Sequence, residues 1–437
     1  MEDNIIDKTC INILNDDCII EIFLLLPIAD RIRSERVCKR WRNLGKESWK
    51  EVRILDVKKS TWGLPEESNN YNLDIVKHVL TRCGKFLKQL NVLQWPLNSD
   101  HKPMSVICEY CPNLQCINLM GIDKFWLSTS DIRSLRNNYQ NLSKLIMTDV
   151  KLECEDHLSQ LFKATKKLKY LSVGGLVGHT DLSGKCLQYL PGDAIEEIHL
   201  IRWGNLNPNY LNAALRKFNN LRVLEMFPFN RFDNSTLGII GEKRTIIDLS
   251  LFNTPGRVIS SINYLFNLQN LERLCLRRNL MINDIFLINI SNNLKQLKYL
   301  NISSCKEVTD VGISNLALLE KLEVLIANRL DKITNEPFGN FYNLKVLKCA
   351  RCENIIDPGI MKLISLAPNL TTLDLFRCSI TNQTIEKAIE ITKQRTNSII
   401  LEINIHKTKV DMSMIPDTSP YLRIVDTRPT DYYYYEV

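Results

Sequence analysis

Residues 297–313 read Leu-Lys-Tyr-Leu-Asn-Ile-Ser-Ser-Cys-Lys-Glu-Val-Thr-Asp-Val-Gly-Ile, and this pattern decides the fold. Leu297, Leu300 and Ile302 are spaced as in a short strand with one buried face, because side chains alternate across a strand. Thr309 then stands where a helix can begin, since its hydroxyl can accept an unpaired N–H group of the first turn. The stretch therefore predicts one strand, a polar turn and one helix.

The same pattern recurs along the chain, with 22 to 28 residues between successive copies. A repeat of this length is typical of leucine-rich repeats, in which each unit cannot cover its own leucines and must stack on its neighbours. We therefore expect an α/β fold, a curved leucine-rich-repeat solenoid (horseshoe) with parallel strands on its concave face and helices on its convex face. The copies begin at Leu87, Leu114, Leu142, Leu168, Ile195, Leu221, Ile246, Leu271, Leu297, Leu322, Leu344 and Leu370.

A cysteine follows the strand in several copies. Cys305, Cys352 and Cys378 occupy this turn position, and Asn279 takes the equivalent place in another copy. With the Val-Thr-Asp and Ile-Thr-Asn turns downstream, these copies resemble the cysteine-containing subtype of leucine-rich repeat. Trp203 departs from the subtype at this position, so we expect a less regular turn there.

The first forty residues follow a different pattern. Apolar residues at positions 14, 18, 19, 22, 23 and 26 form one helical stripe, which Pro27 ends. A second helix is expected after Asp30, and it would bring Val37, Cys38, Trp41 and Leu44 together. A unit this small cannot bury all of its apolar surface internally, and spare apolar surface usually marks a partner.

These residues resemble the F-box family, whose pattern has the same order and spacing, with Asp17 in place of its glutamate and Asn15 in place of its first proline. The resemblance implies an adaptor-binding set made of Leu14, Ile19, Ile22, Phe23, Leu26, Pro27, Val37, Cys38 and Trp41.

That resemblance also implies a function. An F-box docks on a Skp-type adaptor, which is joined to a cullin and a RING subunit, and the repeats hold the protein to be ubiquitinated. The chain would then be a substrate-recognition subunit of an SCF-type ubiquitin ligase, acting in protein ubiquitination and proteasomal degradation without a catalytic group of its own. The alternative is a leucine-rich-repeat scaffold that binds a partner without ubiquitin transfer.

The expected domains follow from these patterns. An F-box is expected over 8–50, irregular first repeats over 51–110, regular repeats over 111–410, and a C-terminal cap and tail over 411–437. The stretch 58–72 is polar and turn-rich, so we expect a surface loop there.

Composition excludes several classes of protein. The chain is 45% hydrophobic and 24% charged, as in ordinary globular proteins, and its net charge of +7 is too mild to indicate a nucleic-acid binder. Because apolar runs stay far below the roughly 20 residues of a membrane span, we expect no membrane insertion. The 14 cysteines and the acidic first residues favour thiols in the cytoplasm or nucleus. We expect no cofactor, no metal site and no catalytic residue.

A substrate surface is expected on the concave face. The last variable position of each copy is basic in most of the C-terminal repeats, and an apolar patch precedes this column. Such a column predicts an acidic or phosphorylated partner segment, because guanidinium groups bind carboxylates and phosphates bidentately. The expected residues are Ile201, Arg202, Phe227, Phe252, Arg277, Arg278, Arg329, Arg351, Arg377 and Lys407.

Overall fold

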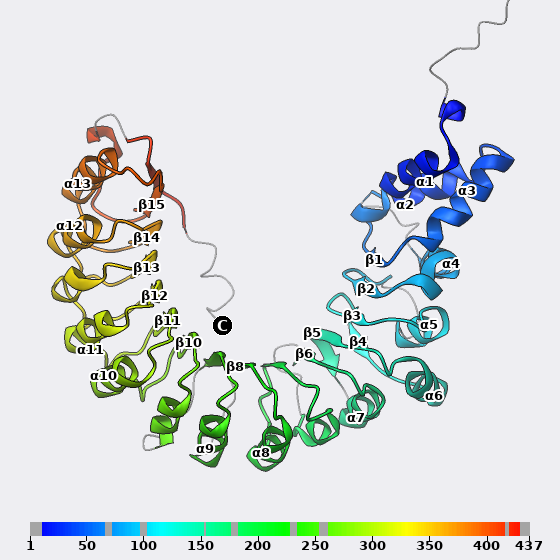
Figure 1. Ribbon diagram of the computed structural model, residues 1–437, viewed down its shortest axis with the longest axis horizontal. Helices are drawn as coiled ribbons and strands as arrows, with labels where there is room; N and C mark the ends of the chain where they lie inside the picture. The colour runs from blue at the N-terminus through cyan, green and yellow to red at the C-terminus, as the bar shows by residue number, and fades with distance from the viewer. Residues whose placement is uncertain are drawn as a thin grey trace, which may run out of the picture. The chain divides into compact units, whose positions relative to one another are not determined.

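The computed structural model describes residues 11–65, 72–96, 103–152, 154–175, 182–227, 234–252, 261–415 and 419–428. The chain divides into two compact units, residues 1–203 and 204–437. In both units the strands form one layer, and the helices pack on one face of this layer (Figure 1). The predicted fold class is confirmed: a helical N-terminal segment is followed by a leucine-rich-repeat solenoid.

Unit 1 begins with helices and continues as a parallel sheet in the order β1-β2-β3-β5-β6-β7, with β4 beside β5. The helical segment comprises η1 (Ile11–Ile13), α1 (Asp16–Leu25), α2 (Ile28–Ser34) and α3 (Lys39–Lys50). The strands are β1 (Ile54–Val57), β2 (Gln89–Val92), β3 (Cys116–Asn118), β4 (Lys124–Phe125), β5 (Lys144–Leu152), β6 (Tyr170–Gly175) and β7 (Glu197–Ile201). The connecting helices are η2 (Ser60–Trp62), α4 (Leu73–Cys83), η3 (Gly84–Phe86), α5 (Pro103–Tyr110), α6 (Thr129–Asn138), α7 (Glu155–Ala164) and η4 (Lys185–Tyr189).

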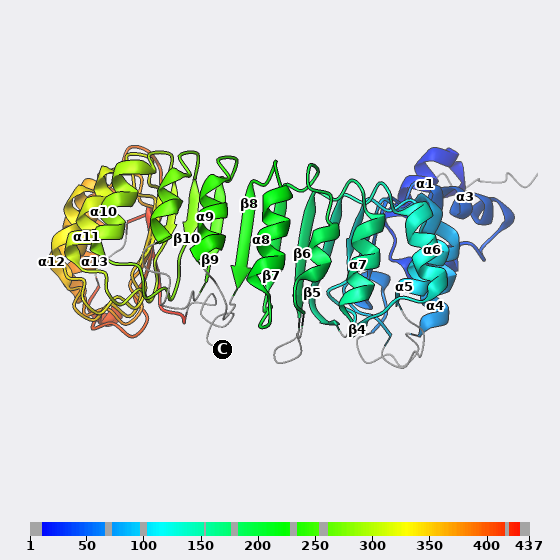
Figure 2. The ribbon, with the colours of Figure 1, turned by 90° about the horizontal axis from the view of Figure 1, so that it is seen from below.

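Unit 2 is a parallel sheet that runs in sequence order from β8 to β16. Its strands are β8 (Val223–Phe227), β9 (Asp248–Leu251), β10 (Arg273–Cys275), β11 (Tyr299–Asn301), β12 (Val324–Ile326), β13 (Val346–Lys348), β14 (Thr372–Asp374), β15 (Leu401–Asn404) and β16 (Leu422–Val425). Its helices are α8 (Pro208–Lys217), α9 (Asn234–Glu242), η5 (Ser261–Asn267), α10 (Asp284–Asn293), α11 (Asp310–Asn315), η6 (Leu316–Leu318), η7 (Glu336–Asn340), α12 (Asp357–Leu366), α13 (Asn382–Lys393) and η8 (Met412–Met414). The view from below shows β8, β9 and β10 side by side, with α8 and α9 in front of the sheet (Figure 2).

The leucines of successive repeats lie in register and form the core. Leu274 pairs with Leu300, Leu300 with Leu325, and Leu325 with Leu347. All four side chains are fully buried, as the alternating pattern of the sequence predicts. Because each leucine rests on the leucines of both neighbouring strands, a repeat is buried only within the stack.

An acidic side chain near the start of one helix binds the turn before the next helix. The carboxylate of Asp357 accepts hydrogen bonds from the backbone N–H of Thr381 (2.8 Å) and Thr384 (3.2 Å) and from both of their hydroxyls. Asp284 accepts from Thr309 and Gly312 in the same way. These bonds satisfy helix N-terminal N–H groups of one repeat with a side chain of the preceding repeat.

In several repeats the residue at the cysteine position ties the turn after the strand to the preceding repeat. The thiol of Cys305 donates to the carbonyl of Leu276 (3.1 Å), and that of Cys378 to the carbonyl of Cys349 (3.1 Å). At the same position the indole Nε1 of Trp203 donates to the carbonyl of Val173 (3.0 Å), and the ring is fully buried. We expected an irregular turn at Trp203, and the structure contradicts this prediction. The indole makes the same hydrogen bond there that a thiol makes in other repeats.

Two other expectations differ from the structure. The predicted single second helix is two helices, α2 and α3, with Val37 between them and Cys38 as the N-cap of α3, so Val37 does not share a helical face with Leu44. In the predicted surface loop over 58–72, Trp62 is buried, and its indole donates to the carbonyl of Asp56 (2.6 Å). Residues 66–71 of that loop and 429–437 of the predicted tail lie outside the described residues. None of the helices within the described residues is long and apolar enough to span a membrane.

Replacing Asp357 by alanine should lower the free energy of unfolding by about 2–4 kcal/mol, because buried N–H and hydroxyl donors of Thr381 and Thr384 lose their acceptor. Urea denaturation followed by circular dichroism measures the change. The control Glu386→Ala removes an exposed carboxylate from α13 and should leave the midpoint unchanged. Equal midpoints for the two variants would show that the hydrogen bonds accepted by Asp357 do not stabilise the stack of repeats.

Candidate functional site

The N-terminal helices have a small core of their own. Ile19, Phe23 and Leu44 are buried, and Leu26 and Trp41 pack against them. The rings of Phe23 and Trp41 meet edge to face at 5.2 Å between centroids. Ile19 and Phe23 are fully buried, so they hold the helices together instead of presenting a surface. Both are core residues of this segment, and their contact with an adaptor stays a prediction.

The other predicted contact residues lie at least partly on the surface. Leu14, Pro27, Val37 and Cys38 are exposed, and Ile22, Leu26 and Trp41 are half-buried. Val37 is 63% exposed, which is high for a valine.

Two exposed apolar residues of this segment were not predicted from the sequence: Leu25, which is 85% exposed at the end of α1, and Ile13, which is 60% exposed. The signal for Leu25 was its position seven residues after Cys18 and three after Ile22, which places all three on one helical face. We call Ile13, Leu14, Cys18, Leu25, Val37 and Cys38, which are all exposed, the exposed apolar set.

Polar contacts fix the start of α1 against α3. Asn15 caps α1 by accepting a hydrogen bond from the backbone N–H of Cys18 (2.8 Å). The guanidinium of Arg40 on α3 donates to the carboxylate of Asp16 (2.7 Å) and to the carbonyl of Leu14 (2.7 Å). These bonds hold the start of α3, with Val37 and Cys38 just before it, next to Leu14. Asparagine thus serves as an N-cap at the position where the F-box pattern has proline.

An ion pair between the buried Glu35 and the half-buried Arg82 joins the helical segment to the first repeat. The carboxylate of Glu35 accepts from Nε1 of Trp49 (2.7 Å) and from the guanidinium of Arg82 on α4 (2.9 Å). Burial alone would raise the pKa of Glu35, but the hydrogen bonds from Arg82 and Trp49 and the charge of Arg82 outweigh it, so the pKa lies below its ordinary value. This contact fixes the helical segment on the repeats.

A second contact lies beside the ion pair. Gly63 follows η2 at φ +70°, and a Cβ there would lie 2.9 Å from Cβ of Pro27, so the turn approaches the end of α1 closely. Trp62, the preceding residue, lines a cavity of about 340 Å³ together with Leu24, Leu26, Trp49 and residues of β1. Pro27, predicted to contact an adaptor, therefore also lies against the first repeat.

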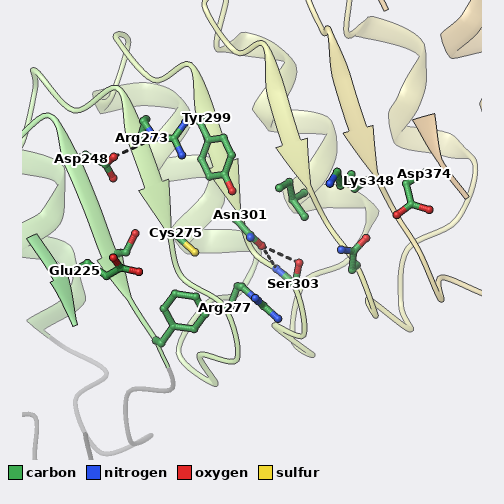
Figure 3. Close-up of a pocket in the computed structure, with 14 residues that line it drawn as sticks. Glu225, Asp248, Arg273, Cys275, Arg277, Tyr299, Asn301, Ser303, Lys348 and Asp374 are labelled. Atoms are coloured by element: carbon green, nitrogen blue, oxygen red, sulfur yellow. Dashed lines mark hydrogen bonds and ion pairs between the residues drawn. The ribbon is translucent and has the colours of Figure 1, made fainter. Parts of the chain in front are cut away.

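A pocket of about 410 Å³ opens on the strand layer of unit 2 (Figure 3). Arg273 forms an ion pair with Asp248 (3.0 Å) and lies over the ring of Tyr299 (4.0 Å). Phe252 lies beneath the guanidinium of Arg277 at 5.3 Å. Three acidic side chains (Glu225, Asp248 and Asp374) and three basic ones (Arg273, Arg277 and Lys348) line this pocket, so it carries no field of a single sign.

A second groove of unit 2, of about 590 Å³, follows the turns after the strands. We call it the basic groove; it is lined by Arg278, Leu280, Ser304, Lys306, Arg329, Asp331, Arg351, Glu353 and Arg377. One wall is the predicted basic column, one residue from each repeat. The other wall is formed by the residues two positions later in each repeat, which are Leu280, Lys306, Asp331 and Glu353. The groove contains five cationic side chains and two carboxylates, so its net charge is positive.

The basic column has an unusual backbone. Arg278, Ser304, Arg329, Arg351 and Arg377 all have φ between 55° and 62°, in the left-handed region. Each of their N–H groups donates to a carbonyl of the next repeat, as from Arg278 to Ser303 (2.9 Å) and from Arg329 to Ala350 (2.9 Å). The hydrogen bonds between repeats therefore impose a conformation that glycine and asparagine adopt more readily than arginine.

The structure does not bring all of the predicted substrate residues together. Arg278, Arg329, Arg351 and Arg377 line the basic groove, whereas Arg277 and Phe252 line the pocket on the strand layer. Phe227 packs on Phe252 (4.9 Å), and Lys407 is exposed with the same left-handed φ. Ile201 and Arg202 belong to unit 1, where Arg202 pairs with Asp149 at 2.8 Å.

Within the described residues, no group of three or more His, Cys, Asp or Glu side chains is placed to hold a metal ion. The two Cys-x-x-Cys pairs of the sequence are buried thiols. Burial raises the pKa of Cys108 to about 12 and also raises the pKa of Cys352. Both cysteines therefore pack as small apolar residues.

Known protein families share this arrangement. Residues 11–51 match the F-box domain, and residues 294–317 match a leucine-rich repeat. Rad7, in the crystal structure of the yeast Rad7–Elc1 complex, aligns at a TM-score of 0.57 and 18% identity over 89% of this chain and 94% of that chain. This likeness is one of fold.

Two curated relatives share part of the sequence. A Caenorhabditis elegans protein named "Putative RNA-binding protein EEED8.10" is 23% identical over 373 residues, 82% of this chain and 49% of that protein. "Antagonist of mitotic exit network protein 1" of Candida glabrata is 33% identical over 94 residues, 22% of this chain and 18% of that protein. The chain thus spans about half the length of the first relative and less of the second.

Replacing Glu35 by glutamine should lower the free energy of unfolding at pH 7 by about 2–3 kcal/mol, because the negative charge and one of two acceptor oxygens are lost at a buried site. The folded-state pKa lies below the unfolded value of about 4.3, so the carboxylate stabilises the fold above that pH. Its contribution disappears as the pH falls through the folded pKa. The difference between wild type and variant should therefore shrink on acidification.

Chemical denaturation at a series of pH values measures this difference. The exposed Glu47 forms an ion pair with Lys50 on the surface of α3, so Glu47→Gln is the matched control and should leave the stability nearly unchanged. A difference between wild type and Glu35→Gln that stays constant down to pH 3 would contradict the role of the Glu35 charge.

Proposed function

We propose that this chain, which is an F-box protein with leucine-rich repeats, is the substrate-recognition subunit of an SCF-type ubiquitin ligase. Its F-box would dock on a Skp-type adaptor, and its repeats would bind the protein to be ubiquitinated. The observation that carries the proposal is the exposed apolar set on a segment that matches the F-box and already has a complete core. Apolar side chains that are this exposed on a folded segment favour a protein partner.

The proposed role needs no catalytic side chain in this chain. A receptor accelerates transfer by holding the substrate near the loaded conjugating enzyme, which raises the effective concentration of the acceptor lysine. The Glu35–Arg82 ion pair and the packing of Trp62 suit this role, because they attach the F-box to the first repeat without a flexible linker. A fixed attachment preserves the distance between adaptor and substrate.

The alternative is a scaffold that binds a partner without ubiquitin transfer. Rad7, with which this chain shares its fold, is solved in complex with Elc1. A different adaptor, or an adaptor without a cullin, would use the same exposed apolar set. We propose the cytoplasm or nucleus as the compartment, where such adaptors act.

Leu25→Asp combined with Val37→Asp should reduce binding of a Skp-type adaptor by at least about 100-fold, because two exposed apolar contacts are replaced by charges at a site that must be desolvated. Affinity purification of the full chain from cells, with quantification of adaptor and cullin, measures the effect. Wild type should recover both proteins. Leu26 and Trp41, which the F-box resemblance also implies as contacts, are less suitable for this test because both side chains pack on the core.

The matched control is Ile285→Asp combined with Leu318→Asp, which places the same charges on exposed apolar residues of unit 2. It should recover adaptor and cullin at wild-type levels. Recovery of stoichiometric adaptor without cullin by the wild type would favour the scaffold. Recovery of a relative of Elc1 in place of a Skp-type adaptor would reassign the partner.

Arg351→Glu combined with Arg377→Glu should reduce the capture of substrate proteins by about tenfold or more, because attraction across the basic groove becomes repulsion. Quantitative mass spectrometry of proteins captured under proteasome inhibition measures the loss, and adaptor recovery should stay unchanged. If the same proteins are captured at equal yield by wild type and variant, the groove takes no part in substrate binding.

A further inference from the structure

We propose that the basic groove holds a phosphorylated side chain of a partner peptide over Ser304, between Arg278 and Arg329. The inference deepens the proposed function and rests on it, since it assigns a chemical class to the substrate. Three features of the described residues support it. The first is the small side chain of Ser304 among the arginines of the basic column. The others are the distribution of carboxylates along the groove and the backbone conformation of the basic column.

The first feature is the geometry of the row. Ser304 is the smallest side chain of the basic column, and Arg278 and Arg329 stand in the same backbone conformation one repeat before and after it. Neighbouring strands lie about 4.8 Å apart, so the two arginines start about 10 Å apart, a span that two long side chains can close around one phosphate. Lys306, on the same repeat as Ser304, lines the opposite wall. The site thus has three cations around a hydroxyl.

The backbone takes no part in this recognition. The N–H groups of Arg278, Ser304 and Arg329 donate to the carbonyls of Ser303, Asn328 and Ala350, each at 2.9 Å. A ligand over Ser304 must therefore be bound by side chains. Guanidinium groups suit a phosphate, because their planar fork binds two of its oxygens at once.

The second feature is the charge along the groove. Arg278, Leu280, Ser304 and Lys306 line one end of the groove without a carboxylate. Asp331 stands on the repeat of Arg329, and Glu353 stands one repeat further away. Glu307, next to Lys306 in sequence, is engaged by Lys332 at 2.8 Å. The dianionic phosphate, with a charge of about −1.5 to −2, is therefore favoured at the Ser304 end over the Glu353 end.

The third feature is the backbone conformation itself. A left-handed φ is unfavourable for a non-glycine residue, and arginine has no special preference for it. The turn itself therefore does not favour arginine at four of these five positions. Arg351 and Arg377 stack on the ring of Phe376, at 5.5 and 5.6 Å. A phosphate ligand would explain the guanidinium groups on either side of Ser304.

The phosphate chemistry could also suit a nucleic acid, but the groove favours a peptide. Its lining residues include no aromatic side chain on which a base could stack, and two carboxylates interrupt the path that a phosphate backbone would follow. A single phosphate on a peptide needs only the Ser304 end.

The test uses the full chain and arrayed peptides with degenerate flanks around a central phosphoserine, phosphothreonine or phosphotyrosine, with matched unphosphorylated and glutamate arrays. We expect binding to at least one phosphorylated array at least tenfold above its unphosphorylated match. Arg278→Glu combined with Arg329→Glu should abolish this excess. Ser304→Glu removes no cation but places a carboxylate where the phosphate would bind, so it should abolish the excess as well.

The control for net charge is Lys295→Glu combined with Lys393→Glu, two exposed lysines outside the groove, and it should bind like the wild type. Circular dichroism verifies that every variant is folded. Equal binding to phosphorylated and unphosphorylated arrays, retention of the excess by the Ser304→Glu variant, or binding of single-stranded RNA in preference to every peptide would overturn the proposal. Because no adaptor is involved, failure here is distinguishable from failure of the ubiquitin-ligase assignment.

Discussion

Repeats of unit 2 satisfy buried polar groups of their neighbours. The N–H groups at the start of α13 find their acceptor in Asp357 of the preceding repeat, and the carbonyl of Cys349 finds its donor in Cys378 of the following one. A buried polar group without a partner is costly, so a repeat removed from the stack would lose both its leucine contacts and these bonds. The solenoid is therefore cooperative at the level of single hydrogen bonds as well as at the level of its core.

The same rule governs the junction with the helical segment. Glu35 is buried on the side of that segment which faces the repeats, and its partner Arg82 comes from the first of their helices. The polar network lies at this junction, while apolar side chains such as Leu25 point to solvent. One side of the segment therefore packs on the repeats, and its exposed apolar residues remain accessible to another protein. An adaptor-binding module would need this arrangement.

Much of this could be predicted from the sequence, and the exceptions have physical causes. The leucine spacing predicts the strands and their register, because burial of one face leaves a single way to stack them. The apolar pattern of α1 could not show that Phe23 is buried and Leu25 is exposed, because both are large and apolar and only packing against α3 distinguishes them. The prediction for Trp203 was wrong because a residue-type pattern cannot show that an indole N–H can replace a thiol.

The basic groove shows a further limit. Its charge is visible in the sequence, but the left-handed backbone at Arg278 and Arg329 is imposed by bonds between repeats and has no local signature. The pocket residues Arg273 and Tyr299 were missed for a related reason, since their contact joins side chains of two different strands. What a repeat pattern predicts well is the fold, and what it predicts poorly is how side chains from different repeats meet.

The left-handed backbone of the basic column also constrains how the groove can change over evolutionary time. At such positions a change from arginine to glycine or asparagine relieves the backbone, so drift without selection would erode the charge while making the protein more stable. Elsewhere in the solenoid drift is opposed by the loss of stability that accompanies most substitutions. The groove is thus a surface where stability and recognition pull in opposite directions, and arginines that persist on either side of Ser304 across related proteins would indicate selection for binding.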